Sequence, residues 1–226
     1  MPRTPRTIAP PQTPRLDGDL QPRALPGLEG GARVEEAVVA GAELAGVRAA
    51  GAGLREVRLL DPDLAGARLD GVRLADVAIE RGDLANVVAP EAAWRRVTVT
   101  GVRLTGAQWP RATIADTVFR DCRIDLASFA GTTFERTAFD GCRLAQTDFR
   151  GALLRSVRFD GCDLTEADFT DVRIDRCELR DCALHGLTGV ERLRGAAMPW
   201  ADVVGHAALL AAALGIRVLG EEDRRP

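Results

Sequence analysis

A five-residue period through the middle of the chain constrains its fold more than any other feature. From Val34 to Leu184 every fifth residue is apolar and most are large, which gives 31 units without an insertion or a deletion. All seven Phe of the 226 residues lie in this column. A period of five is too short for an amphipathic helix and shorter than helical or propeller repeats. The repeat therefore sets the organisation of the chain from residue 32 onward.

Each unit has a second inward position, two residues before the large one. It holds a small residue, most often Ala, Val, Thr or Cys. The two positions after the large residue are polar or turn-forming, and 12 Gly from Gly41 to Gly186 occupy the second of them. Glycine at that point is typical of a corner where the backbone changes direction. With aromatic residues at 4% and no Tyr, the predicted core is mostly aliphatic.

These units resemble the pentapeptide repeat family, whose unit reads A(D/N)Lxx. The match is carried by the segments "AELAG", "PDLAGARLDGVRL", "ADVAI", "CRLAQTDFRGALL" and "CDLTEADFTDVRI". The resemblance covers about 155 of the 226 residues. It implies an all-β solenoid, a right-handed quadrilateral β-helix in which four units make one coil. At about 4.8 Å between stacked strands, the units correspond to about eight coils and a rod about 37 Å long.

The resemblance divides the chain into three parts. Residues 32–186 form the predicted β-helix, and residues 187–226 form a C-terminal cap helix and tail. Residues 1–31 hold seven of the twelve Pro together with scattered Arg and Thr. Such a composition is typical of a disordered or extended tail. The alternative is that the tail drapes over the first coil, whose inward residues Val34, Val39 and Ala49 are small.

The C-terminal part has a different pattern, because the five-residue period fails at Gly189. Pro199 then precedes an apolar series that predicts an amphipathic helix ending near Gly215: Trp200, Val203, Val204, Leu209, Leu210, Leu214 and Ile216. The segment "GIRVL" after it is a candidate short strand. A solenoid end must be covered. Since several family members dimerise through such an element, the resemblance implies a homodimer through Trp200, Val203, Val204, Leu210 and Leu214, with an intramolecular cap as the alternative.

A less regular stretch lies between residues 62 and 90. Pro62 and Gly82 occupy small positions, and Ala89 occupies a large one. These departures from the repeat indicate a candidate bend in the rod.

The five Cys are interpreted as core residues. Cys122, Cys142, Cys162 and Cys182 recur at intervals of four units and stack in one inward column, while Cys177 belongs to the neighbouring face. A straight ladder cannot surround a tetrahedral zinc ion, and the CxxC spacing of structural sites is absent. Free Cys packs well as a small apolar residue. We therefore expect no metal and no cofactor.

Catalytic patterns are absent from the sequence. His185 and His206 have no partnering motif, and no nucleophile elbow, phosphate-binding loop or dinucleotide fingerprint occurs. The carboxylates of the repeats sit in outward positions, and a filled β-helix would leave no interior pocket for a substrate. The sequence predicts that the protein is not an enzyme.

Charge and hydropathy limit the partners. With 30 Arg against 33 Asp and Glu, a net charge of −3 argues against direct nucleic-acid binding through a basic surface. The longest apolar run is far shorter than the roughly 18 residues of a membrane span, and the first 30 residues hold no apolar signal segment. We expect a soluble cytoplasmic protein.

A charged column on one face is the candidate partner-binding surface. The residue before each large one reads Glu43, Asp63, Asp83, Arg103, Arg123, Arg143 and Asp163, so that the sign changes twice. A second acidic group holds Glu166, Asp168 and Asp171. Such columns form either a solvated ladder or a docking surface for a protein of matching charge.

The best-known members of the resembled family bind type II topoisomerases by imitating duplex DNA. A rod of that length would have to imitate about 20 negative charges of DNA, whereas residues 32–186 hold 25 acidic residues and 21 Arg. Only local acidic patches are therefore available for such imitation. The array has no projecting loops, as in the mycobacterial type. Two hypotheses follow: a DNA-mimicking modulator of DNA gyrase or topoisomerase IV, and a scaffold module with an unknown protein partner.

Overall fold

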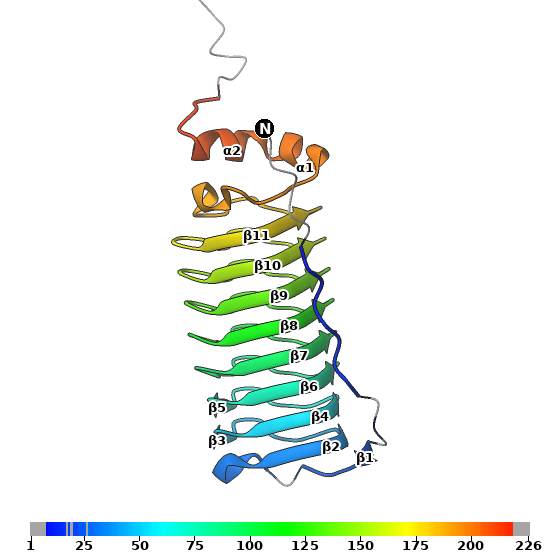
Figure 1. The fold of residues 1–226 in the computed structure, drawn as a ribbon. Helices are drawn as coiled ribbons and strands as arrows, with labels where there is room; N and C mark the ends of the chain where they lie inside the picture. Colours follow the sequence, from blue (N-terminus) through cyan, green and yellow to red (C-terminus); the bar gives the residue numbers. More distant parts are fainter. Residues whose placement is uncertain (1–7, 17, 19, 26, 219–226) are drawn as a thin grey trace, which may run out of the picture.

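Parallel strands stack into a rod in the computed structural model, which describes residues 8–16, 18, 20–25 and 27–218 (Figure 1). The rod is built from eight long strands: β2 (Arg33–Ala40), β4 (Gly53–Leu60), β6 (Arg73–Glu80), β7 (Ala93–Thr100), β8 (Thr113–Arg120), β9 (Thr133–Asp140), β10 (Leu153–Asp160) and β11 (Arg173–Arg180). Shorter elements are β1 (Gln21–Pro22), β3 (Arg48–Ala50), β5 (Arg68–Asp70) and the 3₁₀ turns η1 (Glu29–Gly31) and η2 (Val190–Leu193). The chain ends in α1 (Trp200–Gly205) and α2 (Ala207–Ala213).

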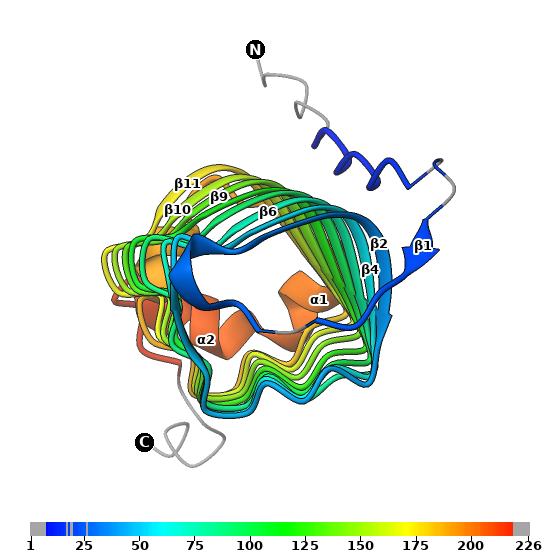
Figure 2. The same ribbon diagram turned by 90° about the horizontal axis from the view of Figure 1, so that it is seen from below.

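The register confirms that four five-residue units make one coil. Each residue of a long strand pairs with the residue four units further along the chain, as Leu54 pairs with Leu74 and Phe119 with Phe139. Viewed along its axis, the rod shows coils that superimpose into one closed outline (Figure 2). We name the four faces by their first large residue: face A (Val34), face B (Val39), face C (Leu44) and face D (Ala49). The predicted quadrilateral β-helix of about eight coils is confirmed.

Each long strand turns from face A to face B at its fourth residue. The backbone there has a positive φ, for example 57° at Asp76 and 50° at Asp116, a conformation that is costly for residues other than Gly. We call this column the A–B corner. Its eight residues include no Gly: Glu36, Glu56, Asp76, Arg96, Asp116, Arg136, Ser156 and Arg176. Because each corner residue carries a side chain, the corner presents a continuous polar ladder along the rod.

Aromatic stacking fills the C-terminal half of the core. All seven Phe are fully buried. On face B the Phe139 ring stacks between Phe119 at 4.8 Å and Phe159 at 5.0 Å, measured between ring centroids. The predicted assignment of large residues to the interior is therefore correct for the whole Phe set.

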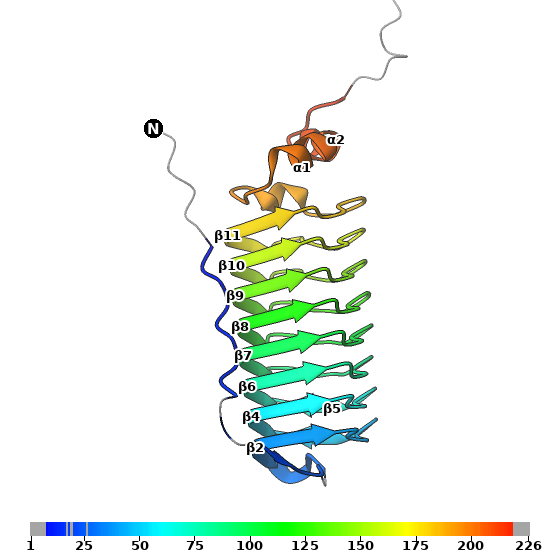
Figure 3. The same cartoon turned by 90° about the vertical axis from the view of Figure 1, so that its right-hand side faces the viewer.

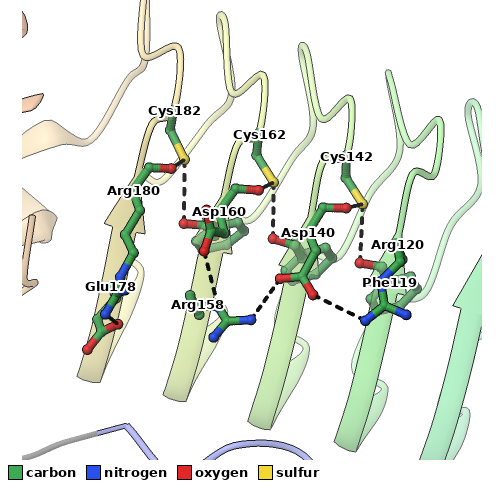
Figure 4. Close-up of polar contacts among 12 residues, drawn as sticks. Phe119, Arg120, Asp140, Cys142, Arg158, Asp160, Cys162, Glu178, Arg180 and Cys182 are labelled. Atoms are coloured by element: carbon green, nitrogen blue, oxygen red, sulfur yellow. Dashed lines mark hydrogen bonds and ion pairs between the residues drawn. The ribbon is translucent and has the colours of Figure 1, made fainter.

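Hydroxyl and thiol groups in the small positions find partners within the wall of the rod. Thr132 Oγ1 donates to the carbonyl oxygen of Trp109 at 2.6 Å, and Cys142 Sγ donates to that of Phe119 at 3.5 Å. Cys162 and Cys182 repeat this contact in the next two coils (Figure 4). The five thiols are buried and free, as expected for core residues. Burial raises the pKa of the Cys177 thiol to about 12.

The N-terminal half of the interior is incompletely filled, contrary to the expectation from sequence. A cavity of about 40 Å³ lies among aliphatic and Trp side chains that include Leu64, Leu84, Ala89 and Trp94. It arises because Leu and Ala take the large positions in these coils, where the later coils have Phe. Usual ligand pockets begin at roughly 300 Å³, so the cavity offers no room for a drug-sized molecule.

The rod continues without a break across residues 62–90, the less regular stretch of the repeat. β4, β6 and β7 pair in unbroken register, and the strands stack without a kink (Figure 3). Pro62 and Gly82 are stacked in consecutive coils of face C, where the ring of one takes space left by the missing side chain of the other.

The C-terminal end of the core is closed by η2, which the sequence pattern did not single out. Leu187, Val190 and Leu193 are buried there, whereas no residue of α1 or α2 is buried. Two short helices replace the single helix that was predicted, because the backbone leaves helical geometry at His206. Its Nε2 lies 2.9 Å from the carbonyl oxygen of Cys182. Residues 216–218 form no strand, and Leu219 lies outside the described residues.

Among the described residues, helix α1 has six residues and helix α2 has seven, which is too few for either to cross a bilayer.

The described part of the N-terminal segment follows a defined course over the first coil and along the rod. β1 pairs in parallel with β2, and Leu28 is buried against the first coil. Residues 8–16 run along the side of the rod, across its strands (Figure 3). The segment therefore both covers the first coil and extends far beyond it.

Candidate functional site

The charged column predicted from the sequence lies on face C. Single parallel β-bridges link successive members, so that the backbone of each lies against the next. The linked residues are Glu43, Asp63, Asp83, Arg103, Arg123, Arg143 and Asp163. The structure therefore brings the whole predicted column together, with an acidic part, a basic part and an acidic end.

Ion pairs neutralise part of this column. Arg103 Nη1 lies 3.1 Å from Asp83 Oδ2, and Arg143 Nε lies 3.5 Å from Asp125 Oδ1. Arg123, between them, has no ion pair or hydrogen bond from its side chain to any residue that the structure describes. Its guanidinium is consequently the free cation at the centre of the basic part.

Backbone hydrogen bonds hold the acidic members in place. Asp63 Oδ1 accepts from the Ala65 amide at 3.0 Å, and Asp83 Oδ1 accepts from the Ala85 amide at 2.8 Å. Asp163 Oδ1 accepts from the Thr165 amide at 3.0 Å, and hydrogen bonding with Thr165 lowers the Asp163 pKa. These backbone hydrogen bonds therefore orient the three carboxylates along the face.

A shallow depression lies over the basic part of face C. The three Arg line it together with Thr105, Asp125 and Leu126. Leu126 is 58% exposed although it is a large apolar residue at a corner with positive φ. An exposed apolar side chain beside stacked cations is a feature that partner surfaces use.

The second acidic group is spread around face D. Glu166 accepts from Gln146 Nε2 at 2.7 Å, and Asp171 accepts from Arg192 Nη2 at 2.8 Å. Asp168 accepts from the Thr170 amide at 2.8 Å and from Thr188 Oγ1 at 3.0 Å. All three carboxylates thus have partners, which lie mostly in neighbouring coils and were not identified from the sequence.

The predicted dimer residues are divided by exposure. Trp200, Val204 and Leu214 are 79%, 56% and 78% exposed, whereas Val203 and Leu210 are half-buried. Leu210 and Leu214 line a groove with Val190 and Leu193 of η2. The helices therefore present an apolar outer surface in the single chain.

Groups with catalytic potential are dispersed. Within the described ranges, no cluster of three or more His, Cys, Asp or Glu side chains could hold a metal ion. The His206 ring faces the carbonyl oxygen of Cys182, so that its Nε2 is engaged by the backbone. Figure 4 shows surface ion pairs, such as Arg158 with Asp140 at 3.0 Å, beside the hydrogen bonds of the Cys ladder.

One polar site was missed by sequence reasoning. At the A–B corner, Arg96 Nε donates to Asp76 Oδ1 at 2.6 Å, and Arg136 Nε donates to Asp116 Oδ1 at 2.7 Å. Asp76, Arg96 and Asp116 are buried. The signal that could have revealed it is the alternation of Asp and Arg at intervals of four repeat units.

Comparison with known proteins supports the repeat assignment. Residues 92–169 and 112–188 match the family model described as "Pentapeptide repeat region". No curated protein matches the chain significantly.

Several solved structures resemble this chain at low sequence identity. HetL, a pentapeptide repeat protein involved in heterocyst differentiation regulation from the cyanobacterium Nostoc sp., has 20% identity, covering 77% of this chain and 93% of its own, with a TM-score of 0.39. A trypsin-treated form of QnrB1, a plasmid-mediated fluoroquinolone resistance protein, has 16% identity, 85% and 93% coverage and a TM-score of 0.42. Rfr23, a pentapeptide repeat protein from the cyanobacterium Cyanothece 51142, has 15% identity, 61% and 88% coverage and a TM-score of 0.24.

Proposed function

We propose that this chain, which belongs to the pentapeptide repeat family, is a non-enzymatic rod that binds a protein partner through face C. The observation that carries the proposal is the basic part of the charged column. Arg123 has no partner among the described residues, and it lies between two further exposed Arg and beside the exposed Leu126. Desolvating these groups against an acidic partner surface would give both specificity and fast association.

The shape of the molecule supports a role at its outer surface. The cavity described above is small and apolar, so that no substrate of ordinary size can enter it. A solenoid without projecting loops offers long, flat faces instead, and such faces suit protein binding.

DNA gyrase or topoisomerase IV is the more specific partner that we propose, through local imitation of DNA. The acidic part of the column, Glu43 with Asp63 and Asp83, would take the place of successive phosphates on a strand. Because Arg103 neutralises Asp83 and the repeats carry nearly balanced charge, this imitation would be confined to one end of the rod. A scaffold role with another protein partner is the alternative, and it is favoured by the mixed sign of the same column.

A homodimer through the C-terminal helices is part of the proposal. Trp200, Val204 and Leu214 are exposed in the single chain, and a two-fold interface would bury them. Such a dimer would place two rods end to end.

A supercoiling assay tests the gyrase partner. Purified protein is titrated into DNA gyrase and into topoisomerase IV, with and without a fluoroquinolone. We expect inhibition or drug protection at low micromolar protein, weakened by Asp63→Arg. No effect on either enzyme would reject the topoisomerase partner and leave the scaffold role.

Charge reversal tests face C itself. Arg123→Glu should weaken binding at least tenfold to a partner protein, recovered by affinity capture, whose acidic surface contacts the basic part of the column. Arg73→Glu is the matched control, because Arg73 occupies the same position of its unit on face A and is likewise exposed. Equal effects of the two substitutions would exclude face C as the binding surface.

A further inference from the structure

We propose that the A–B corner is a docking site for a proline-rich segment of a partner protein in the polyproline II conformation, and that residues 8–16 are its resident occupant. This site lies on another side of the rod from face C, and it does not depend on the function proposed there. We call residues 8–16 the strap.

Burial of the strap follows a period of three. Ile8, Pro11 and Pro14 are half-buried, and the two residues after Ile8 and after Pro11 are exposed. Polyproline II has three residues per turn, so that every third side chain points to the same side. With three Pro among nine residues, the strap is therefore suited to present one edge to the rod.

The rise of the strap matches the spacing of the coils. The Gln12 amide lies 3.3 Å from Asp116 Oδ1, and the Arg15 amide lies 2.9 Å from Asp76 Oδ1. Three residues of polyproline II rise about 9.3 Å, and two coils of the rod span about 9.6 Å. Every third amide of such a segment can consequently meet every second corner carboxylate without strain.

Arginines in the intervening coils orient the two acceptors. Arg136 donates from Nε and Nη2 to the two oxygens of Asp116 at 2.7 Å and 2.9 Å. Arg96 binds Asp76 in the same two-pronged way. Hydrogen bonds from these Arg lower the pKa of both carboxyls, which keeps them ionised. The acceptors are therefore preorganised before any segment binds.

The strand surface beside the corner is smooth over four coils. The outward positions on face B hold Ala78, Thr98, Val118 and Ala138, and the long charged Arg58 and Arg158 stand at the two ends. Ala78 and Ala138 are buried although they point away from the core. Thr13, Pro14 and Leu16 border a groove with Ala78 and Thr98. Small side chains along this track leave room for a covering segment.

The contacts made by the strap are those that another segment could make. Its hydrogen bonds to the corner come from the amides of Gln12 and Arg15, and no side chain of residues 8–16 forms a hydrogen bond with the described rod. The site therefore recognises a segment in the polyproline II conformation that has a free backbone amide at every third residue. Other sites for polyproline II segments likewise recognise a preformed shape. Because the strap belongs to the same chain, its high local concentration limits access by a partner.

A peptide-binding experiment on the full chain tests the site. The double substitution Gln12→Pro and Arg15→Pro removes both amide donors while keeping the φ angle of polyproline II. The probe is a fluorescein-labelled peptide with the sequence of residues 8–16. We expect the probe to bind this variant at least tenfold more tightly than the wild-type chain, since the resident strap is weakened.

Two controls link the binding to the corner. In the double variant, Asp116→Asn should weaken probe binding at least tenfold, whereas Asp121→Asn at the next corner of the same coil should leave it unchanged. A probe with Pro at the positions of Gln12 and Arg15 should not bind, and this result needs no change in the rod. Equal probe affinity for the wild-type chain and the double variant, or binding of the Pro-substituted probe, would overturn the proposal. Light scattering measures the oligomeric state of both proteins. If the wild-type chain is a dimer and the double substitution dissociates it, the site is occupied by a second copy of this chain, and the proposal is overturned.

Discussion

The ring of Pro62 occupies the space that a side chain at Gly82 would need. A β-carbon placed on Gly82 would lie 2.6 Å from Pro62 Cγ and 2.7 Å from the Pro62 carbonyl oxygen. The two residues occupy the same small position of face C in consecutive coils. What looks in the sequence like two separate irregularities is therefore one matched pair, and the rod passes it in unbroken register.

Gly82→Ala should lower the free energy of unfolding by about 1–3 kcal/mol, because the added methyl group overpacks the wall against Pro62. Adding Pro62→Ala should recover part of this loss by removing the ring. Urea denaturation measures both effects. Gly53→Ala is the control, because the nearest atom to a β-carbon added at Gly53 is Arg33 Cγ, 3.9 Å away. An equal loss of stability in Gly53→Ala would contradict the packing explanation.

Phe139→Ala should lower the free energy of unfolding by about 3–5 kcal/mol, as expected for truncation of a fully buried ring. The ring stacks on both Phe119 and Phe159, so the cavity would interrupt the aromatic column. Arg143→Ala should cost little, because the Arg143 side chain that pairs with Asp125 is exposed. An unchanged thermal midpoint for Phe139→Ala would show that the inward phase has been misassigned.

The Asp116–Arg136 pair should make the free energy of unfolding depend on pH in the acidic range. Hydrogen bonding by Arg136 lowers the Asp116 pKa, against the opposing effect of burial. The pair therefore stabilises the fold above the unfolded-state pKa of about 3.9, and this contribution is lost as the pH falls through the lower folded-state pKa. We expect the free energy of unfolding to differ less between pH 5 and pH 2 in Asp116→Asn than in the wild-type chain, as measured by denaturation at both pH values. An identical difference would mean that this pair does not contribute.

Ala89→Val should raise the free energy of unfolding by about 0.5–2 kcal/mol, in the range found for cavity filling. Ala89 is buried at a large position of face D and lines the cavity of about 40 Å³. Ala127→Val is the control, because Ala127 is buried outside that lining and should show no gain. Thermal denaturation compares the two; a gain at both sites would point to a general effect of Val.

Most of the β-helix could be predicted because its information is local. The position of a residue within its five-residue unit determines whether its side chain points inward. The sequence alone therefore places Phe139 in the core and Cys142 in the small position beside it. The stacking of equivalent positions then follows from four units per coil, and it correctly aligns the face C column from Glu43 to Asp163. No long-range information is needed for these assignments.

The ends and the covering segments depended on the tertiary structure. The contact of the Gln12 amide with Asp116 joins residues 104 positions apart, and no repeat in the sequence encodes it. The same holds for the interruption at His206, where the ring meets the carbonyl of Cys182. A periodic sequence determines the cross-section of the rod, because neighbouring units decide it. The path of the strap and the way the core is closed depend on which distant surfaces meet, and only the folded chain brings those together.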